Sequence, residues 1–404
     1  MELPFRKPGR GAHRGPAGIV TVEARIATLD EDAAVAPTEA DRRAVRATVV
    51  ESLTDIWSRN LQTSPIFPES NFFDLGGDSL LAVGLLLDIE QQFGRKFPIT
   101  TIYDAPTVAE QADLLESGPT AKFSPLVLLK PGCGNAPLFI VHGIGGTVIE
   151  LDALGKQIRA DGPVYAIQAR GLDGSEPPLE SVAEMAAFYL DAIKEVQPAG
   201  PYYIAGYSFG GLVALEMARS IGEKDVALLL MIDSYALPST WPLKSRVSRN
   251  RRIWLNRMRL LATRPPGESA KKLIGRLNRL VKRRTQLAAT GGARQPNPAR
   301  QWLGEPDANL PLSLRQVQDA GGIALMSYAP QRYDGKITFL KAETAQVVFP
   351  TDPANIWSRM GQAFELHAVP GDHASMIRHH SNQIAQCISA CLAAIEHGKA
   401  TDAG

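Results

Sequence analysis

Residues 202–211 have the sequence Tyr-Tyr-Ile-Ala-Gly-Tyr-Ser-Phe-Gly-Gly, and an apolar stretch follows directly. Residues 202–205 predict a short buried strand, and residues 210–221 predict a helix. The glycines at positions 206 and 210 permit a tight turn between the two, which would lift Ser208 above the edge of a sheet. A Gly-x-Ser-x-Gly motif is a weak signal when it stands alone. Between a strand and a helix, it favours a catalytic nucleophile at Ser208 over a structural serine in a glycine-rich turn.

Further apolar runs of strand length lie on both sides of this motif and alternate with helical stretches. The expected strands are 138–141, 164–167, 226–232, 337–340 and 364–368, with another helix at 182–196. Such alternation is typical of a mostly parallel sheet with helices on both faces. Together with the nucleophile motif it resembles the α/β-hydrolase fold, which we expect for residues 138–396.

A serine hydroxyl becomes a good nucleophile only when a base removes its proton, so a histidine is needed. The chain has seven histidines. In α/β-hydrolases the base comes last in chain order, on a loop after the final strand. Residues 369–373, Val-Pro-Gly-Asp-His, form such a loop, which makes His373 the expected base. We expect His379 and His380 to be solvated in the next helix, and His367 to lie within the last strand.

The acid that orients the histidine has three candidates. Asp233 directly follows the predicted strand 226–232, at the end of the sheet where a carboxylate would face the histidine. Asp352 and Glu343 lie nearer the position that follows a later strand. Chain order alone does not choose among the three.

Negative charge that develops on a carbonyl oxygen during acyl transfer needs fixed N–H donors. One expected donor is the backbone N–H of Phe209, the residue after the nucleophile. The second is expected from the loop His-Gly-Ile-Gly-Gly at 142–146, at Ile144. We expect His142 to be a positioning residue at the end of a buried strand, without a catalytic role.

Residues 41–117 have a different, helical pattern. The first helix has an apolar face, formed by Val45, Val49, Leu53 and Ile56. Residues 71–80, Asn-Phe-Phe-Asp-Leu-Gly-Gly-Asp-Ser-Leu, then lead through two glycines into a second helix that begins near Ser79. A hydroxyl there lies at the positive end of a helix dipole, which suits a phosphodiester. The alternative is that Asp78 or Ser79 only caps the helix.

The string 71–80 resembles the attachment site of carrier domains in nonribosomal peptide and polyketide synthases. The resemblance covers about 41–117, although Ser70 departs from the acidic residue often found before the asparagine. It implies a small all-α carrier bundle with 4′-phosphopantetheine linked covalently to Ser79, attached by a phosphopantetheinyl transferase. No adenylation, condensation or ketosynthase sequence accompanies it in this chain. We therefore expect separate loading or synthetase enzymes to act in trans, or the loading domains to belong to a part of the protein outside this sequence.

The second part of the chain resembles the type I thioesterase domains that end nonribosomal peptide synthetases. The matching pieces are 142–146, 206–211, 233–235 and 371–373. The resemblance favours Asp233 as the acid and implies an acyl-enzyme on Ser208, followed by release through hydrolysis or cyclisation. Two alternatives stay open: an acyl-binding module without hydrolysis, and an acyltransferase to an amine or alcohol.

The expected domain limits follow from these patterns. We assign 1–40 to a tail or linker and 41–117 to the carrier. A linker at 118–137 precedes the hydrolase at 138–396, and 397–404 form a second tail. A basic segment at about 241–310 interrupts the hydrolase pattern, at the position where this fold inserts a helical lid.

The basic segment contains 17 Lys and Arg residues against 3 Asp and Glu residues. Three interpretations compete: a lid with a solvated basic face, a docking surface for acidic carriers, and a site for an anionic membrane or acyl group. The predicted carrier has 12 acidic and 6 basic residues, which is compatible with docking. Charge alone does not separate the three.

The overall composition excludes several classes. Net charge is +1, so nucleic acid is not an expected partner. The N-terminus lacks the apolar core of a signal peptide, and no apolar run approaches the roughly 20 residues of a membrane span. The three cysteines, Cys133, Cys387 and Cys391, have neither metal-binding nor disulfide spacing. We therefore expect a cytoplasmic protein without a metal.

Overall fold

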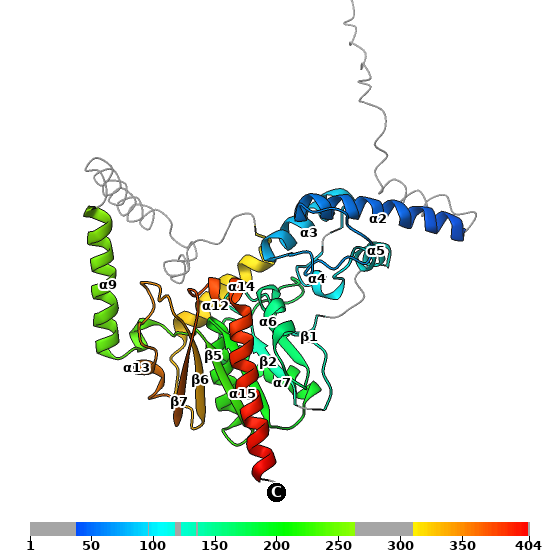
Figure 1. Cartoon of the computed structure of the whole chain (residues 1–404). Coiled ribbons are helices and arrows are strands. Elements are labelled where there is room, and N and C mark those ends of the chain that lie inside the picture. Colours follow the sequence, from blue (N-terminus) through cyan, green and yellow to red (C-terminus); the bar gives the residue numbers. More distant parts are fainter. Residues whose placement is uncertain (1–37, 96, 118–122, 135, 263–309, 403–404) are drawn as a thin grey trace, which may run out of the picture.

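The computed structural model describes residues 38–95, 97–117, 123–134, 136–262 and 310–402. Two parts are visible in Figure 1: a small helical unit, coloured blue to cyan, and a larger unit in which helices cover a central sheet. The predicted fold class, an all-α carrier bundle before an α/β-hydrolase, is confirmed.

The helical unit contains α2 (Glu39–Leu61), α3 (Ser79–Phe93), α4 (Thr101–Asp104) and α5 (Val108–Ser117). A reciprocal capping box begins α2, because the Thr38 hydroxyl accepts from the N–H of Asp41 and the Asp41 carboxylate accepts from the N–H of Thr38. Three of the four predicted apolar residues of α2 are buried. Beside them, the Trp57 indole N–H donates to Oε1 of buried Gln111 at 2.9 Å.

The larger unit is built on a seven-stranded sheet with the order β1-β3-β2-β4-β5-β6-β7. Its strands are β1 (Leu126–Lys130), β2 (Leu138–Val141), β3 (Val164–Ile167), β4 (Tyr202–Tyr207), β5 (Val226–Ile232), β6 (Lys336–Ala342) and β7 (Ala363–Val369). β1 pairs antiparallel with β3, and all other pairs are parallel. Every residue of β2 and β4 is buried, as expected for parallel strands covered on both faces.

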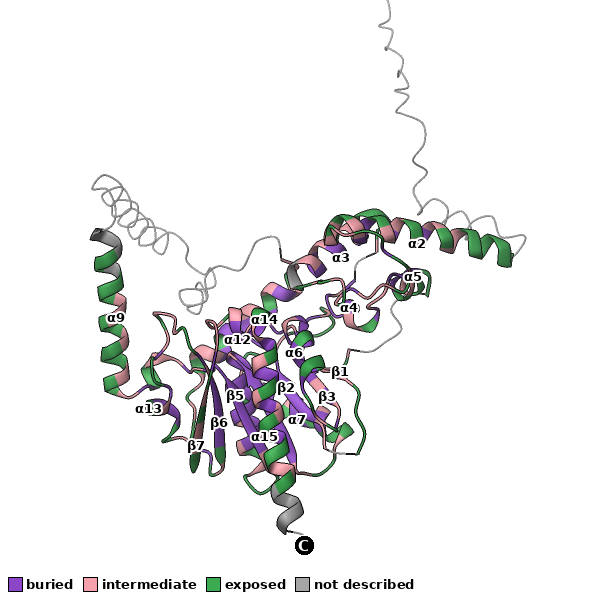
Figure 2. Cartoon of the chain, in the orientation of Figure 1, coloured by how far each residue is buried: buried purple, intermediate pink, exposed green. Residues whose placement is uncertain are grey.

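Helices on the two faces of the sheet create two apolar layers. One layer is covered by α7 (Val182–Val196) and α8 (Phe209–Ile221), and the other by α6 (Asp152–Gln157) and α15 (Ser381–Asp402). Residues of β4 alternate between them: Ile204 joins the first layer, while Tyr203 and Ala205 join the second. Figure 2 shows the resulting buried strands between more exposed helices.

The remaining elements are short or lie near the edge of the sheet. They are η1 (Ile149–Leu151), η2 (Pro238–Thr240), α9 (Leu243–Ala262), α12 (Leu312–Ser327), α13 (Ala354–Trp357) and α14 (Ser375–His379). α12 lies between the two units, since Leu314 and Val317 belong to the same apolar cluster as the core of the helical unit.

The structure corrects two boundaries expected from sequence. β1 lies inside 118–137, which was assigned to a linker, and it extends the sheet before residue 138. Its sequence contains the apolar run Leu-Val-Leu-Leu at 126–129, but the surrounding prolines and glycines are typical of a linker. In the structure β1 is an edge strand with Leu128 half exposed and a register irregularity before Lys130. At the other end, α15 continues to Asp402, past the expected limit at 396.

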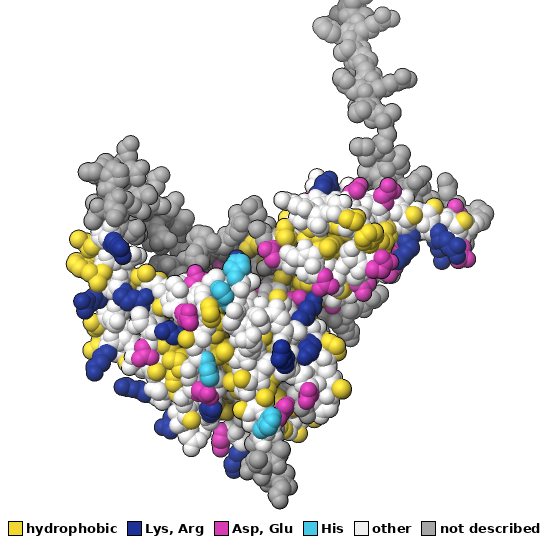
Figure 3. Space-filling model, in the orientation of Figure 1, with side chains coloured by type: hydrophobic (Ala, Val, Ile, Leu, Met, Phe, Trp, Pro, Cys, Tyr) yellow, Lys and Arg dark blue, Asp and Glu magenta, His cyan; other side chains and the backbone are white. Residues whose placement is uncertain are grey.

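Of the predicted basic lid, only residues 241–262 and Leu310 are described. Residues 263–309 lie outside the described part of the chain, as do residues 1–37 of the expected tail. The described portion forms α9, where Lys and Arg side chains gather together with exposed apolar residues, at the left of Figure 3.

Within the described residues, no helix has both the length and the apolar character needed to span a membrane. The same residues contain no cluster of three or more His, Cys, Asp or Glu side chains that could hold a metal ion.

Candidate active site

The turn between β4 and α8 places Ser208 at the carboxyl edge of the sheet. Ser208 has φ of 56° and ψ of −119°, a backbone conformation that costs energy for any residue other than glycine. A side chain at Gly206 would collide with the backbone of Gly210, and one at Gly210 would collide with the carbonyl of His142. The two motif glycines are therefore required by close backbone contact around the serine.

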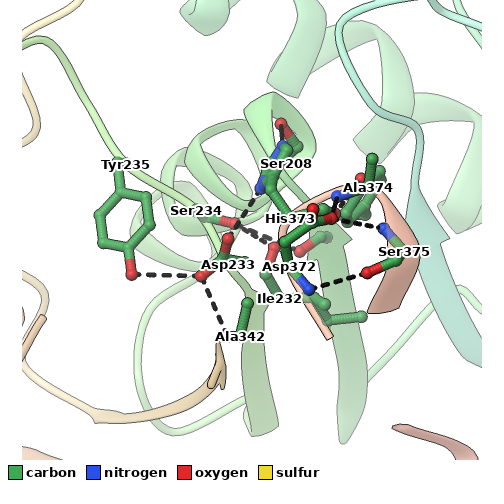
Figure 4. Close-up of polar contacts among 12 residues, drawn as sticks. Ser208, Ile232, Asp233, Ser234, Tyr235, Ala342, Asp372, His373, Ala374 and Ser375 are labelled. Carbon is green, nitrogen blue, oxygen red and sulfur yellow. Dashed lines mark hydrogen bonds and ion pairs between the residues drawn. The ribbon is translucent and has the colours of Figure 1, made fainter. Parts of the chain in front are cut away.

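Three side chains from separate loops lie in one hydrogen-bonded line (Figure 4). Nε2 of His373 lies 2.9 Å from Oγ of Ser208, and Nδ1 lies 2.8 Å from Oδ2 of Asp233. A carboxylate can only accept a hydrogen bond, so it favours the tautomer with the proton on Nδ1. Nε2 is then free to accept the proton of the serine hydroxyl.

Asp233 is fixed in place by several contacts besides its hydrogen bond to His373. Its side chain is buried, and its Oδ1 accepts hydrogen bonds from the Tyr235 hydroxyl and the Ala342 N–H, each at 3.2 Å. Its backbone has φ of 46° and donates to the carbonyl of Leu340 at 2.7 Å. These contacts leave Oδ2 directed at His373.

The other two candidate acids lie elsewhere. Asp352 is exposed and accepts from the N–H of Ala354 and the amide of Asn355, which makes it a local turn-forming residue. Glu343 is also exposed. Among the three candidates, the structure brings only Asp233 to the histidine.

Two aromatic rings hold the imidazole of His373. The Tyr207 ring stacks on it with centroids 5.3 Å apart, and the Phe349 ring lies 4.9 Å away. The Tyr207 hydroxyl also donates to the backbone carbonyl of His373 at 2.7 Å. Burial raises the pKa of Tyr207 far above its ordinary value, so the phenol keeps the proton it donates. Tyr207 thus connects the nucleophile turn to the histidine loop.

Phe349 is positioned in turn by arginines of α9. Arg252 donates to the carbonyls of Phe349 and Gln346, at 3.0 and 2.9 Å, and Arg249 donates to the carbonyl of Val348 at 3.0 Å. Both arginines were assigned to the basic lid on sequence. Part of the α9 charge therefore orders a loop that packs against His373, a role that no local sequence pattern indicates.

The loop 142–146 lies beside the nucleophile turn. In the described part of the chain, neither the Ile144 N–H nor the Phe209 N–H donates to a protein acceptor. α12 covers this loop, and its Gly321 leaves room for Ile144: a side chain at position 321 would lie 3.2 Å from Cδ1 of Ile144. α12 thus packs directly against the loop that contains the predicted donor Ile144.

His142 is enclosed and has no contact with the serine. Its side chain is buried, and Nε2 lies 2.7 Å from the Tyr189 hydroxyl. Burial lowers its pKa from 6.5 to about 4. A neutral imidazole that orders the end of β2 agrees with the positioning role expected from sequence.

In the helical unit, Ser79 is the first residue of α3. The preceding Asp78 accepts a hydrogen bond from the N–H of Leu81 at 2.9 Å, so Asp78 acts as the helix cap. Gly76, in the loop before it, is exposed with φ of 84°. This loop-to-helix geometry fits a phosphodiester at Ser79, because the helix N-terminus favours negative charge.

Two known families match the two parts of the chain. Residues 136–392 match the thioesterase domain family, and residues 51–115 match the phosphopantetheine attachment site family. The chain therefore belongs to the thioesterase domain family. It carries a phosphopantetheine attachment domain ahead of the catalytic domain, so 4′-phosphopantetheine is its cofactor.

Similar proteins include much longer synthetases. The chain is 38% identical over 236 residues to malpinin synthetase of Mortierella alpina, covering 55% of this chain and 3% of that protein. It is 36% identical over 230 residues to the dimodular nonribosomal peptide synthase of Bacillus subtilis, covering 54% of this chain and 10% of that protein. Among solved structures, the NocB thioesterase domain with a fluorophosphonate nocardicin G analogue is 22% identical, with a TM-score of 0.45, and covers 67% of this chain and 100% of that one.

The low pKa of His142 predicts a specific pH dependence of stability. Between pH 6.5 and about 4 the unfolded chain binds a proton that the folded chain excludes. The free energy of unfolding should therefore fall as the pH is lowered through this window, with this group contributing a slope of up to about 1.4 kcal/mol per pH unit. Urea unfolding at several pH values should show a smaller slope for His142→Asn than for the wild type. Equal slopes would contradict the assignment.

Proposed function

We propose that the chain releases an acyl or peptidyl group from the phosphopantetheine arm on Ser79 through an ester intermediate on Ser208. The observation that supports this most strongly is the line of hydrogen bonds from Ser208 through His373 to Asp233. The arm supplies a thioester whose carbonyl is open to attack. The catalytic groups that act on this thioester all belong to this chain.

In the proposed acylation step, His373 is the general base. Its Nε2 takes the proton of Ser208 while Oγ forms a bond to the thioester carbon. When the carbon–sulfur bond breaks, His373 returns the proton to the departing sulfur. Asp233 keeps the ring in the required tautomer and stabilises the imidazolium that forms transiently.

The backbone N–H groups of Phe209 and Ile144 are the proposed oxyanion donors. Charge on the carbonyl oxygen increases as Oγ adds to the carbon, so fixed donors stabilise the transition state more than the ground state. α12 supports this geometry because it packs on the loop that contains Ile144.

The proposed second step frees the product from Ser208. His373 removes a proton from water, or from a hydroxyl or amine of the acyl chain, and this nucleophile bonds to the ester carbon. As the bond from that carbon to Oγ breaks, His373 returns the proton to Oγ of Ser208. Water gives an acid, while an internal nucleophile gives a ring. A phosphopantetheinyl transferase would modify Ser79, and separate synthetase enzymes would load it, in line with the longer synthetases to which the chain is similar.

A fluorophosphonate probe tests the nucleophile. The wild type should be labelled, Ser208→Ala should not, and His373→Ala should be labelled at least about 100-fold more slowly, the low end of a general base contribution. Labelling is measured by intact mass against time. The matched control is Ser220→Ala, which changes an exposed serine on α8, the helix that follows Ser208. This variant should react like the wild type. A folded wild type that stays unlabelled would favour the acyl-binding module.

Comparison of two acid variants tests the orienting residue. Asp233→Asn should lower kcat/KM for a soluble thioester by about 10³-fold or more, because an amide stabilises the wrong tautomer. Asp352→Asn makes the same chemical change at an exposed site and should change kcat/KM by less than about two-fold. A larger loss in Asp352→Asn than in Asp233→Asn would reverse the assignment.

Intact mass spectrometry tests the carrier. Incubation with coenzyme A and a phosphopantetheinyl transferase should add one phosphopantetheine mass to the wild type and to Ser70→Ala. Ser79→Ala should gain nothing, because it lacks the acceptor hydroxyl. Addition to Ser79→Ala would place the arm on another residue.

A further inference from the structure

The helical unit contacts the thioesterase unit through side chains that lie close in sequence to Ser79. Phe73 and Asp74 are in the loop before α3, and Lys156 is in α6 of the thioesterase unit. Nζ of Lys156 lies 3.4 Å from Oδ1 of Asp74 and 5.5 Å from the centroid of the Phe73 ring. The same ammonium group lies 3.0 Å from Oδ2 of Asp152, which fixes its direction toward the carrier.

An aromatic residue of α4 strengthens this contact. Tyr103 stacks on Phe73 with centroids 5.0 Å apart and planes 29° apart. It packs against the apolar clusters of both the carrier and the thioesterase. Burial raises the pKa of Tyr103 well above its ordinary value, and the nearby carboxylates of Asp152 and Glu150 raise it further. The aromatic pair is therefore partly buried where the two units meet.

Glu150 connects this contact to the active site. Gly143 belongs to the loop 142–146. A side chain at this position would lie 2.9 Å from Oε1 of Glu150 and 3.3 Å from the Tyr207 ring. Burial raises the pKa of Glu150, while the charges of Arg378 and His373 lower it. Glu150 thus has Tyr103 of the carrier and His373 of the active site among its neighbours. The carrier contact and the active site therefore share Glu150 as a neighbour.

We propose that Phe73, Asp74 and Tyr103 form a recognition patch on the carrier, and that the thioesterase binds this patch through Lys156. This inference rests on the proposed function and names the partner more closely. The surface fits a carrier domain with an aromatic–acidic pair in the loop before its modified serine and a second aromatic residue stacked on that pair. The patch is separate from α9, which provides most of the described basic charge of the predicted lid.

Charge reversal tests the patch in the intact chain. An octanoyl-phosphopantetheine arm is placed on Ser79 from octanoyl-coenzyme A by a phosphopantetheinyl transferase, and release of octanoate is followed in a single turnover. Lys156→Glu and Asp74→Lys should each slow release about five-fold, the upper end for a partly exposed ion pair. The double variant, Lys156→Glu with Asp74→Lys, should recover most of the rate, which a folding defect would not allow.

A soluble substrate separates docking from chemistry. Turnover of octanoyl-N-acetylcysteamine needs no docked carrier, so all three variants should match the wild type with it. Lys194→Glu makes the same charge change at an exposed position of α7 and should leave both rates unchanged. Raising the salt concentration should slow release in the wild type toward the rate of Lys156→Glu, because salt screens the pair.

The outcomes distinguish the two proposals. Unchanged release from Ser79 in both single variants would overturn the recognition patch, as would an equal loss with the soluble thioester. A wild type that hydrolyses neither substrate would contradict the proposed function instead. Selective loss with the carrier-bound substrate, restored by the double reversal, supports the patch.

Discussion

The geometry of the active site depends on two backbone hydrogen bonds that continue the parallel sheet beyond its strands. The Ser208 N–H donates to the carbonyl of Ile232 at 2.8 Å, and the Asp233 N–H donates to the carbonyl of Leu340 at 2.7 Å. They tie the ends of β4, β5 and β6 together, so the nucleophile and the acid leave the sheet at adjacent positions. Both residues have positive φ, and the buried strands beneath them hold these costly conformations in place.

The contact between the two units has a different physical character. Asp74 and Lys156 remain well exposed at 71% and 42% of their side-chain areas, whereas Tyr103 is partly buried. An exposed ion pair contributes little stability, but it can select an orientation, and a buried aromatic side chain contributes area. The ion pair can therefore select an orientation at this contact, while Tyr103 and the apolar cluster that the helical unit shares with Leu314 and Val317 contribute buried area.

Much of this structure could be predicted from the sequence because the signals are local. Buried parallel strands have continuous apolar runs, and the bounds of β2, β3 and β5 agree with those expected. Ser208 and His373 follow from motifs next to such strands. β1 was missed although residues 126–129 are a continuous apolar run, because the prolines and glycines on both sides are typical of a linker. Chain order alone left the acid open because three carboxylates satisfy it, and only the family resemblance favoured Asp233. Arg252 and Phe349 reach the histidine through contacts between distant segments, which no local pattern records.

Tyr207 fixes the position of His373 relative to Ser208. It is covalently joined to Ser208, and its hydroxyl holds the backbone of His373 while its ring supports the imidazole. The positions of Ser208 and His373 are therefore both set by one residue. α12, which packs on the loop that contains Ile144, does not belong to this arrangement, so a change in its position would leave the length of the proton path unchanged. The distance over which the proton moves is thus set by the Tyr207 contacts.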